Sequence, residues 1–306
     1  MELIKNKSDT PLTHPKYHFK KALRPFSLPV ALVTCGLGIA AGYSFQTLNF
    51  QTLNINTALL IFLAGMLLQT GVNLINDYAD TKNPVTLKHL NQKDIKNIIF
   101  NYKAGWICFL LCSFIGLYLV SQSSVFLLIL AITGGCGALF YTTEPINYKR
   151  RGLGVILVFF FMGILMVYGA FFAVTGEHQL YTIIISLPVS FLTSALLLSN
   201  EVRDYACDKK EGLKTLTVRL GYTVGQRLYI LCIVLGFLSV IPIIVINELW
   251  LPSLLLLPAA LLAIEAIKTL LQTSEDEKNQ SNKKLPPKTG KLYLVFGISE
   301  IVLLLL

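Results

Sequence analysis

The stretch NEVRDYACDKKEGLKTLTVRLG, residues 200–221, follows a long apolar run and combines acids, an amide and cations. Asn200, Asp204 and Asp208 are spaced four residues apart, so their side chains share one face if the helix continues. Two carboxylates and an amide at this spacing can hold a hard cation, and Arg203 and Lys214 stand nearby. The stretch therefore predicts a site for a metal ion and an anion.

An earlier stretch, NLINDYADTKN at residues 73–83, has the same character and also stands where an apolar run ends. In chain order it is the first polar stretch, and residues 200–221 are the second. On a continuous helix, Asn73, Asn76 and Asp80 share a face, with Asp77 beside them. We interpret the two stretches as halves of one site that binds a magnesium diphosphate at a membrane surface.

The composition indicates an all-α polytopic membrane protein. The 306 residues are 54% hydrophobic and only 14% charged, with a mean hydropathy of +0.63, whereas soluble domains carry about 25% charged residues. We expect an N-terminal arm over residues 1–25 and one transmembrane domain over residues 26–306, with nine helices around a central cavity. The nine apolar segments are 26–44, 57–79, 104–121, 124–142, 153–174, 180–199, 226–246, 249–271 and 291–306.

The 26 Lys and Arg residues fall in the N-terminal arm and in alternate loops of this arrangement. Positively charged loops stay on the cytoplasmic side, which predicts a cytoplasmic N-terminus and a site that faces the cytoplasm. Attraction to anionic lipid accounts for most of these charges, so the net charge of +9 does not indicate a nucleic-acid partner. We expect an integral protein of the bacterial inner (cytoplasmic) membrane, with membrane lipid as a partner.

The chemistry of the acids favours Mg²⁺ as the cofactor. Two carboxylates about 4 Å apart repel each other by about 4 kcal/mol at an effective dielectric constant near 20, so gathering them requires a cation. No His or Cys joins either stretch, which argues against zinc or iron. An alternative remains open, in which the acids only pair with neighbouring Lys and Arg at the helix ends.

Small residues in the apolar runs have a packing interpretation. Gly134, Gly135 and Gly137 are expected to permit close packing of helices. The six cysteines form no CxxC pair, and five of them lie in apolar runs, so we expect them to be small core residues. These five are Cys35, Cys108, Cys112, Cys136 and Cys232.

Four stretches together resemble the UbiA-type intramembrane aromatic prenyltransferase superfamily. They are LRPFSLPVA at 23–31, NLINDYAD at 73–80, YTTEPINYKRRGLG at 141–154 and the stretch at 200–221. Within that superfamily, the chain is most similar to the menaquinone-pathway 1,4-dihydroxy-2-naphthoate polyprenyltransferases. The resemblance implies a magnesium-dependent transfer of a polyprenyl chain from its diphosphate to an aromatic acceptor, here 1,4-dihydroxy-2-naphthoate.

The resemblance also implies roles for individual residues. Asp80, Asp204 and Asp208 would be catalytic, and Tyr141 and Asn73 would line the acceptor or prenyl pocket. Tyr141, Lys149 and Arg150 are equally well explained as an interface tyrosine and as topology charges. The implied metal ligands are Asn76, Asp77, Asp80, Asp204 and Asp208, and the implied diphosphate ligands are Asn200, Arg203, Lys214, Lys149 and Arg150.

One departure from the family pattern leaves other functions open. Pro84 stands where the last acid of the first motif is expected, and proline offers no ligand atom. The alternatives are a prenyltransferase that uses another phenolic or quinone-precursor acceptor, and a non-catalytic homologue that binds or transports lipid.

Overall fold

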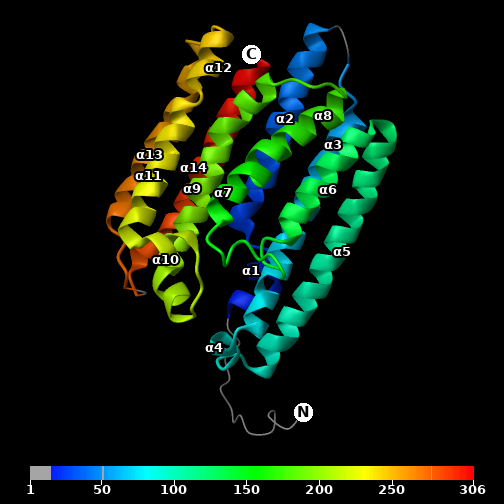
Figure 1. Cartoon of the computed structure of the whole chain (residues 1–306). Coiled ribbons are helices and arrows are strands. Elements are labelled where there is room, and N and C mark those ends of the chain that lie inside the picture. The colour runs from blue at the N-terminus through cyan, green and yellow to red at the C-terminus, as the bar shows by residue number, and fades with distance from the viewer. Residues whose placement is uncertain (1–14, 50–51, 277) are drawn as a thin grey trace.

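The computed structural model describes residues 15–49, 52–276 and 278–306, and this part of the chain contains helices and no strand. The long helices run side by side along the longer dimension of the molecule (Figure 1). They are α2 (Leu28–Leu48), α3 (Ile55–Asn76), α5 (Gln92–Gln122), α6 (Val125–Leu139), α7 (Gly154–Val158) continued by the π-helix η4 (Phe159–Leu165) and α8 (Met166–Thr175), α9 (Tyr181–Lys210), α11 (Tyr222–Leu238), α12 (Ile241–Ile246), α13 (Leu257–Leu271) and α14 (Gln280–Leu305).

Short helical turns connect the long helices at the end of the molecule that carries the polar stretches. They include the arm elements η1 (Pro15–Tyr17), α1 (Phe19–Ala22) and η2 (Pro25–Ser27), and the later turns η3 (Asp77–Lys82), α4 (Pro84–Leu87) and α10 (Leu216–Leu220). A further turn, η5 (Pro252–Leu256), precedes α13.

Each of the nine predicted apolar segments overlaps a helix of the structure. Within the residues that the structure describes, seven helical segments are long and apolar enough to cross a membrane, while Val125–Leu139 is shorter. Helix α14 is long, but it includes the charged residues Lys288, Lys291 and Glu300. The all-helical membrane fold is therefore supported, whereas the number of nine crossings and the orientation of the N-terminus stay predictions.

Two predicted helix starts lie too late because polar residues extend these helices beyond their apolar parts. Helix α5 begins at Gln92 rather than at 104. At this observed start, Asn91 and Asp94 form a capping box. Helix α14 begins at Gln280 rather than at 291, after the cap residue Asn279. Apolar runs mark the buried or lipid-facing part of a helix, and they do not mark its polar ends.

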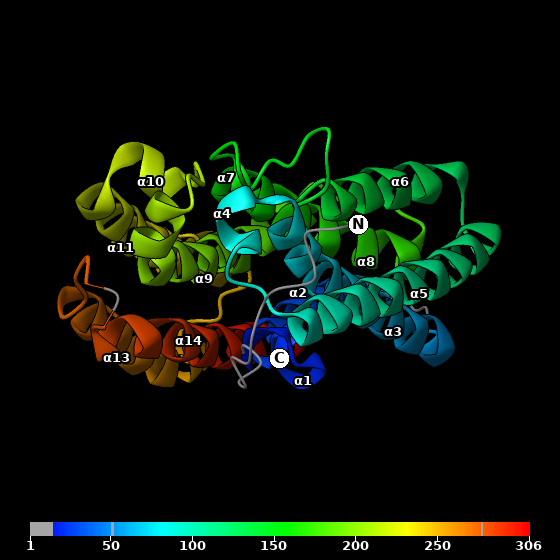
Figure 2. The same cartoon turned by 90° about the horizontal axis from the view of Figure 1, so that it is seen from below.

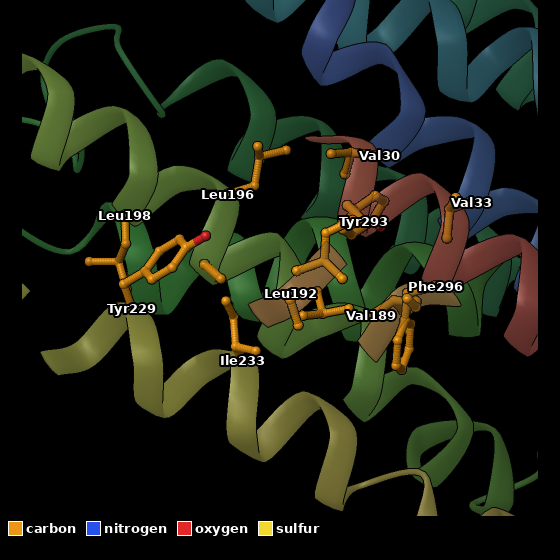
Figure 3. Close-up of a cluster of buried hydrophobic side chains, with 14 of the residues drawn as sticks. Val30, Val33, Val189, Leu192, Leu196, Leu198, Tyr229, Ile233, Tyr293 and Phe296 are labelled. Carbon is orange, nitrogen blue, oxygen red and sulfur yellow. The ribbon is translucent and has the colours of Figure 1, made fainter. Parts of the chain in front are cut away.

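Two large clusters of buried side chains hold different groups of helices together. One joins α9, α11 and α14 to α2 through residues such as Leu192, Tyr229 and Phe296 (Figure 3). The other joins α2, α3, α5, α6 and α8 and includes Ile61 and Phe172. Viewed from below, α9, α11, α13 and α14 lie on one side and α3, α5, α6 and α8 on the other, with α2 between them (Figure 2).

The packing interpretation of the small residues in α6 is only partly correct. A Cβ atom at Gly137 would stand 2.6 Å from the Phe161 ring, so this glycine does permit close packing. The Cβ position of Gly134 has an ordinary contact to Leu165 at 3.6 Å, and that of Gly135 meets no atom within 4 Å. Cys136 is exposed, unlike the buried Cys35, so its assignment to the core was wrong. Gly135 and Cys136 instead line a cavity.

Candidate functional site

A cavity of about 1360 Å³ connects the polar stretches to an apolar interior between the helices. Its polar end is formed by the arm, by the end of α3, by the loop after α6 and by the last turns of α9. Its apolar part is lined by α3, α5, α6, η4 and α8. Along α5 the lining extends from Trp106 to Val120, which is about 21 Å at 1.5 Å per residue.

The second stretch lies on one uninterrupted helix, as its spacing predicts. Helix α9 continues to Lys210, and Asn200, Asp204 and Asp208 all line the cavity. Arg203 lies beside them and holds Asp204 through two hydrogen bonds, Nε to Oδ1 at 2.8 Å and Nη2 to Oδ2 at 2.6 Å. The Asp204 side chain keeps 43% of its surface accessible, so this ion pair is open to a ligand in the cavity.

The turn after α9 folds back onto the same helix. The backbone N–H of Thr217 donates to Oε2 of the buried Glu201 at 2.9 Å, and the hydroxyl of Thr215 lies 3.5 Å from Oδ2 of Asp208. These contacts fix the loop that carries Lys214. They leave the Lys214 side chain exposed and outside the cavity lining, so the structure does not bring this predicted phosphate ligand to the site.

The first stretch does not form the continuous helical face that its spacing predicts. Helix α3 ends at Asn76, and residues 77–82 wind as the tighter 3₁₀-helix η3. Asn73 and Asp77, one α-helical turn apart, line the cavity, whereas Asn76 faces a small side pocket. The expectation that Asn73, Asn76 and Asp80 share one face was therefore wrong. Asp80 lies in η3, and its side chain is outside the part of the structure that is described.

Pro84 begins a new element after this turn. It is the first residue of α4, a position at which proline is favoured, and the side chain of Asn83 caps this short helix. The Asn83 amide also donates to the carbonyl of Glu211 at 3.3 Å, which links the two polar stretches. The position at which the family pattern has an acid is thus occupied by Pro84, the first residue of helix α4.

Arg24 is a site residue that sequence reasoning treated only as a topology charge. Its Nη2 atom stands 2.8 Å from Oδ1 of Asp77, whose side chain is only 2% exposed. Asn73 anchors the arm at this point, because its amide donates to the Leu23 carbonyl at 2.8 Å and to Ser27 Oγ at 2.9 Å. The predicted boundary between residues 25 and 26 runs through this group of contacts. The quoted stretch LRPFSLPVA was the only signal for it.

Lys149 connects the two stretches from the loop between α6 and α7. Its Nζ atom is 3.4 Å from Oδ1 of Asn76 and 5.9 Å from the centre of the Tyr141 ring. Lys149 is also close enough to Asp204 and Asp208 to attract both carboxylates. Because one cation reaches residues of both stretches, the two stretches face a common space.

Tyr141 lines the cavity from the same loop, whereas Arg150 does not. Burial raises the pKa of the Tyr141 phenol, and the nearby charge of Arg24 opposes this shift. Tyr141 therefore stays a neutral hydrogen-bond donor near neutral pH. The Arg150 guanidinium points into the side pocket and donates to the Ala79 carbonyl at 3.3 Å.

The polar end contains ion pairs and also oxygen atoms suited to a metal. Among the described side chains, no three His, Cys, Asp or Glu residues are close enough to hold a metal ion together. Arg24–Asp77 and Arg203–Asp204 follow the pairing that the sequence left open. Within the same described part, Oδ2 of Asp77 and Oδ1 of Asn200 are buried at the cavity without a hydrogen-bond partner. Oxygen atoms of this kind fit a hard cation such as Mg²⁺.

Comparison with known proteins places the chain in a family. A sequence profile described as the UbiA prenyltransferase family matches residues 27–286, which span both polar stretches and most of the cavity lining. The chain belongs to the UbiA prenyltransferase family. The prediction of a prenyltransferase enzyme is thereby confirmed.

Curated relatives agree at the level of the family. "UbiA prenyltransferase domain-containing protein 1" from Mus musculus is 27% identical over 288 residues, covering 90% of this chain and 80% of the relative. The homologue from Drosophila melanogaster is 28% identical, covering 92% of this chain and 77% of the relative. Neither name identifies a menaquinone-pathway enzyme, and both relatives are animal proteins. The predicted branch and the bacterial inner membrane therefore receive no support from them.

Solved structures share the fold of this UbiA family member. A "UbiA homolog from Archaeoglobus fulgidus bound to GPP and Mg2+" superposes with a TM-score of 0.63 at 16% identity, covering 93% of this chain and 99% of that one. A digeranylgeranylglyceryl phosphate synthase superposes with a TM-score of 0.60 at 18% identity over similar shares. At this level of identity the likeness establishes the fold.

Proposed function

We propose that this UbiA family member transfers a polyprenyl chain from its diphosphate to a small aromatic acceptor in a magnesium-dependent reaction. The observation that carries the proposal is a continuous cavity of about 1360 Å³. One end holds acids and cations from both polar stretches, and the rest is apolar. A ligand with a charged head group and a long hydrocarbon chain matches this arrangement, with its head group at the polar end and its chain in the apolar part.

The residues at the polar end have complementary roles in this proposal. Asp77, Asp204 and Asp208, with the amide of Asn200, would hold Mg²⁺, and Asn76 and Asp80 stay predicted ligands. Magnesium bound there neutralises charge on the diphosphate and makes it a better leaving group. Arg24, Arg203 and Lys149 lie near enough to these acids to bind phosphate oxygens. Arg24 would take this role in place of the predicted Lys214.

The loss of diphosphate from an allylic chain leaves a carbocation that water would capture. The half-buried ring of Tyr141 and the buried ring of Tyr148 pack against each other near the polar end, with centroids 5.4 Å apart. They exclude water and offer aromatic faces to a cation. The acceptor would enter beside them and attack the carbocation.

The finer identity of the acceptor rests on the sequence of residues 200–221 alone. That stretch favours 1,4-dihydroxy-2-naphthoate, with product formation accompanied by loss of carboxylate and diphosphate. Another phenolic or quinone-precursor acceptor is the alternative. A panel of acceptors, read by the mass of the product, separates the two.

The function is tested with purified protein in lipid, a labelled prenyl diphosphate and the acceptor panel, with and without Mg²⁺. We expect product only with Mg²⁺, and at least a hundredfold loss of turnover in Asp204→Ala plus Asp208→Ala. Glu177→Gln is the matched control, because Glu177 is an exposed acid outside the cavity. Full turnover in the double variant would refute the metal role. Magnesium-dependent binding without any product would instead support a non-catalytic lipid-binding homologue.

A further inference from the structure

Helix α5 has one exposed face, and this face changes character near its N-terminal end. Residues that follow each other at intervals of three or four positions share this face. Ile107 and Phe114 lie on it and are 58% and 61% exposed. Nearer to the start of the helix, the same face carries Lys96, Phe100 and Lys103, which are all exposed as well. An apolar stripe suited to lipid thus ends in two lysines with an aromatic ring between them.

The length of α5 places these lysines at the membrane surface. Its 31 residues extend over about 46 Å, whereas the hydrocarbon core of a membrane is about 30 Å thick and takes about 20 helical residues. Counted back from Gln122 at the far end of α5, this length ends near Lys103. Tyr102 and Trp106 pack against each other at the same level, where such aromatic residues are enriched. Lys96 and Lys103 therefore lie at the level of the lipid head groups.

The arm adds a third lysine to this face. Helix α1 contacts both α3 and α5, and the Phe19 ring packs edge to face against Phe100 with centroids 5.8 Å apart. Phe19 is still 42% exposed and Phe100 62% exposed. Lys20, the next residue of the arm, is exposed too. We call the group of Lys20, Lys96, Lys103 and this pair of rings the arm–α5 surface.

The charge around the arm–α5 surface is almost purely positive. Residues 15–24 contain four Lys and Arg residues and no acid, and residues 92–107 contain three Lys residues and one acid. That acid, Asp94, is only 1% exposed and belongs to the capping box of α5. The loop between α13 and α14 differs, since Glu275 and Asp276 stand close to its lysines. The arm–α5 surface therefore matches the negative charge of anionic head groups.

The segment that carries Lys20 also carries residues of the candidate site. The next residue, Lys21, lines the cavity, and Arg24 forms the ion pair with the buried acid of the first stretch. On the other side of Lys20, Tyr17 is 3% exposed, and its carbonyl accepts a hydrogen bond from Asn101 Nδ2 of α5 at 3.0 Å. A group that holds Lys20 against α5 thereby holds the arm at the polar end of the cavity.

We propose that the arm–α5 surface binds the head groups of anionic lipids, and that these lipids hold the arm in place at the polar end of the cavity. Phosphate oxygens of the lipids accept hydrogen bonds from Lys20, Lys96 and Lys103. The Phe19 and Phe100 rings lie beside the first part of the acyl chains. The binding of lipid stands by itself, whereas its effect on turnover rests on the proposed function.

Hydrogen exchange of the arm tests the binding. The protein is placed in nanodiscs of phosphatidylcholine, either alone or mixed with phosphatidylglycerol. We expect phosphatidylglycerol to slow the exchange of the backbone amides of residues 15–24 in the native protein. The amount needed for half of this protection should rise roughly fivefold in Lys96→Gln, because one lysine near an anionic surface contributes about this factor. The triple variant Lys20→Gln, Lys96→Gln, Lys103→Gln should show no protection by phosphatidylglycerol.

The matched control removes the same charge elsewhere at this end of the molecule. Lys278→Gln, Lys283→Gln and Lys284→Gln change three exposed lysines near the start of α14, on the opposite side of the bundle from α5 (Figure 2). This variant should keep the full protection by phosphatidylglycerol. An equal loss in both triple variants would show that only the net charge matters and would refute the surface. Exchange of the native arm that does not depend on lipid charge would refute it as well.

Turnover in the same nanodiscs separates this inference from the proposed function. We expect phosphatidylglycerol to lower the KM for the prenyl diphosphate several-fold in the native protein, with little change in kcat, and not in the triple variant of the arm–α5 surface. If no product forms in any nanodisc but the lysines are needed for protection of the arm, the transferase proposal fails and the lipid surface stands. If product forms and neither exchange nor KM depends on lipid charge, the lipid surface fails and the transferase proposal stands.

Discussion

The two polar stretches have similar sequences but different backbones. Residues 200–210 continue one α-helix, so the four-residue spacing of Asn200, Asp204 and Asp208 translates directly into one cavity-facing row. Helix α3 ends at Asn76 and the backbone changes to a 3₁₀-helix at 77–82, so Asp80 does not continue the α-helical spacing of Asn73 and Asn76. Equal spacing thus gives equal geometry only where the winding of the helix is the same.

The partners of the two stretches differ as well. Asp204 pairs with Arg203, its neighbour on the same helix, whereas Asp77 pairs with Arg24, which is 53 residues away in the arm. The second stretch therefore carries its own cation, and the first depends on tertiary structure for one. The following variants test this difference.

Among the variants that compare the two stretches, the largest effect is expected at Lys149, the cation shared by both. Lys149→Ala should lower turnover with prenyl diphosphate about tenfold or more, since it removes a charge near Asn76, Asp204 and Asp208. Lys214→Ala should stay within about twofold, because Lys214 is exposed and outside the cavity lining. Steady-state kinetics on the two variants provides the measurement. The reverse order would show that the sequence motif, and not the observed placement, identifies the phosphate ligands.

An intermediate effect is expected when the Arg24–Asp77 pair is broken. Arg24→Gln leaves a buried carboxylate with no cation, so we expect a loss of about 2–3 kcal/mol in the free energy of unfolding. Asp77→Asn in the same chain should restore much of that stability, although not turnover. Thermal unfolding of the native protein, both single variants and the double variant forms a double-mutant cycle, which measures the interaction energy between the two side chains. Additive losses would mean that the two side chains act independently.

The smallest effect is expected at Pro84. Pro84→Asp restores the acid that the family pattern contains, but the residue stands at the start of α4, one element beyond the turn that holds Asp77. Turnover and its dependence on Mg²⁺ concentration should change less than about threefold, since an acid at the first position of a helix is well tolerated. A tenfold gain would show that Pro84 limits the metal site.

Most of the fold could be predicted from the sequence, because apolar runs report directly which segments avoid water. The long helix α9 and its row of Asn200, Asp204 and Asp208 followed from spacing alone. The starts of α5 and α14 did not, since polar turns beyond an apolar run are set by caps such as Asn91 and Asn279. Gly135 was misinterpreted because a glycine that permits packing and one that leaves a cavity open look alike in a sequence.

The sequence by itself determined that the chain is a helical membrane protein with two acidic stretches, because hydropathy and residue spacing are local properties. The expectation of a prenyltransferase came from the resemblance of four stretches to a known family. Only the tertiary structure decided that Arg24 joins the site, that Asn76 and Lys214 are outside the cavity lining, and that Gly135 and Cys136 belong to it. These facts depend on which distant segments pack together, and on the winding of one helical turn, and no local pattern encodes them.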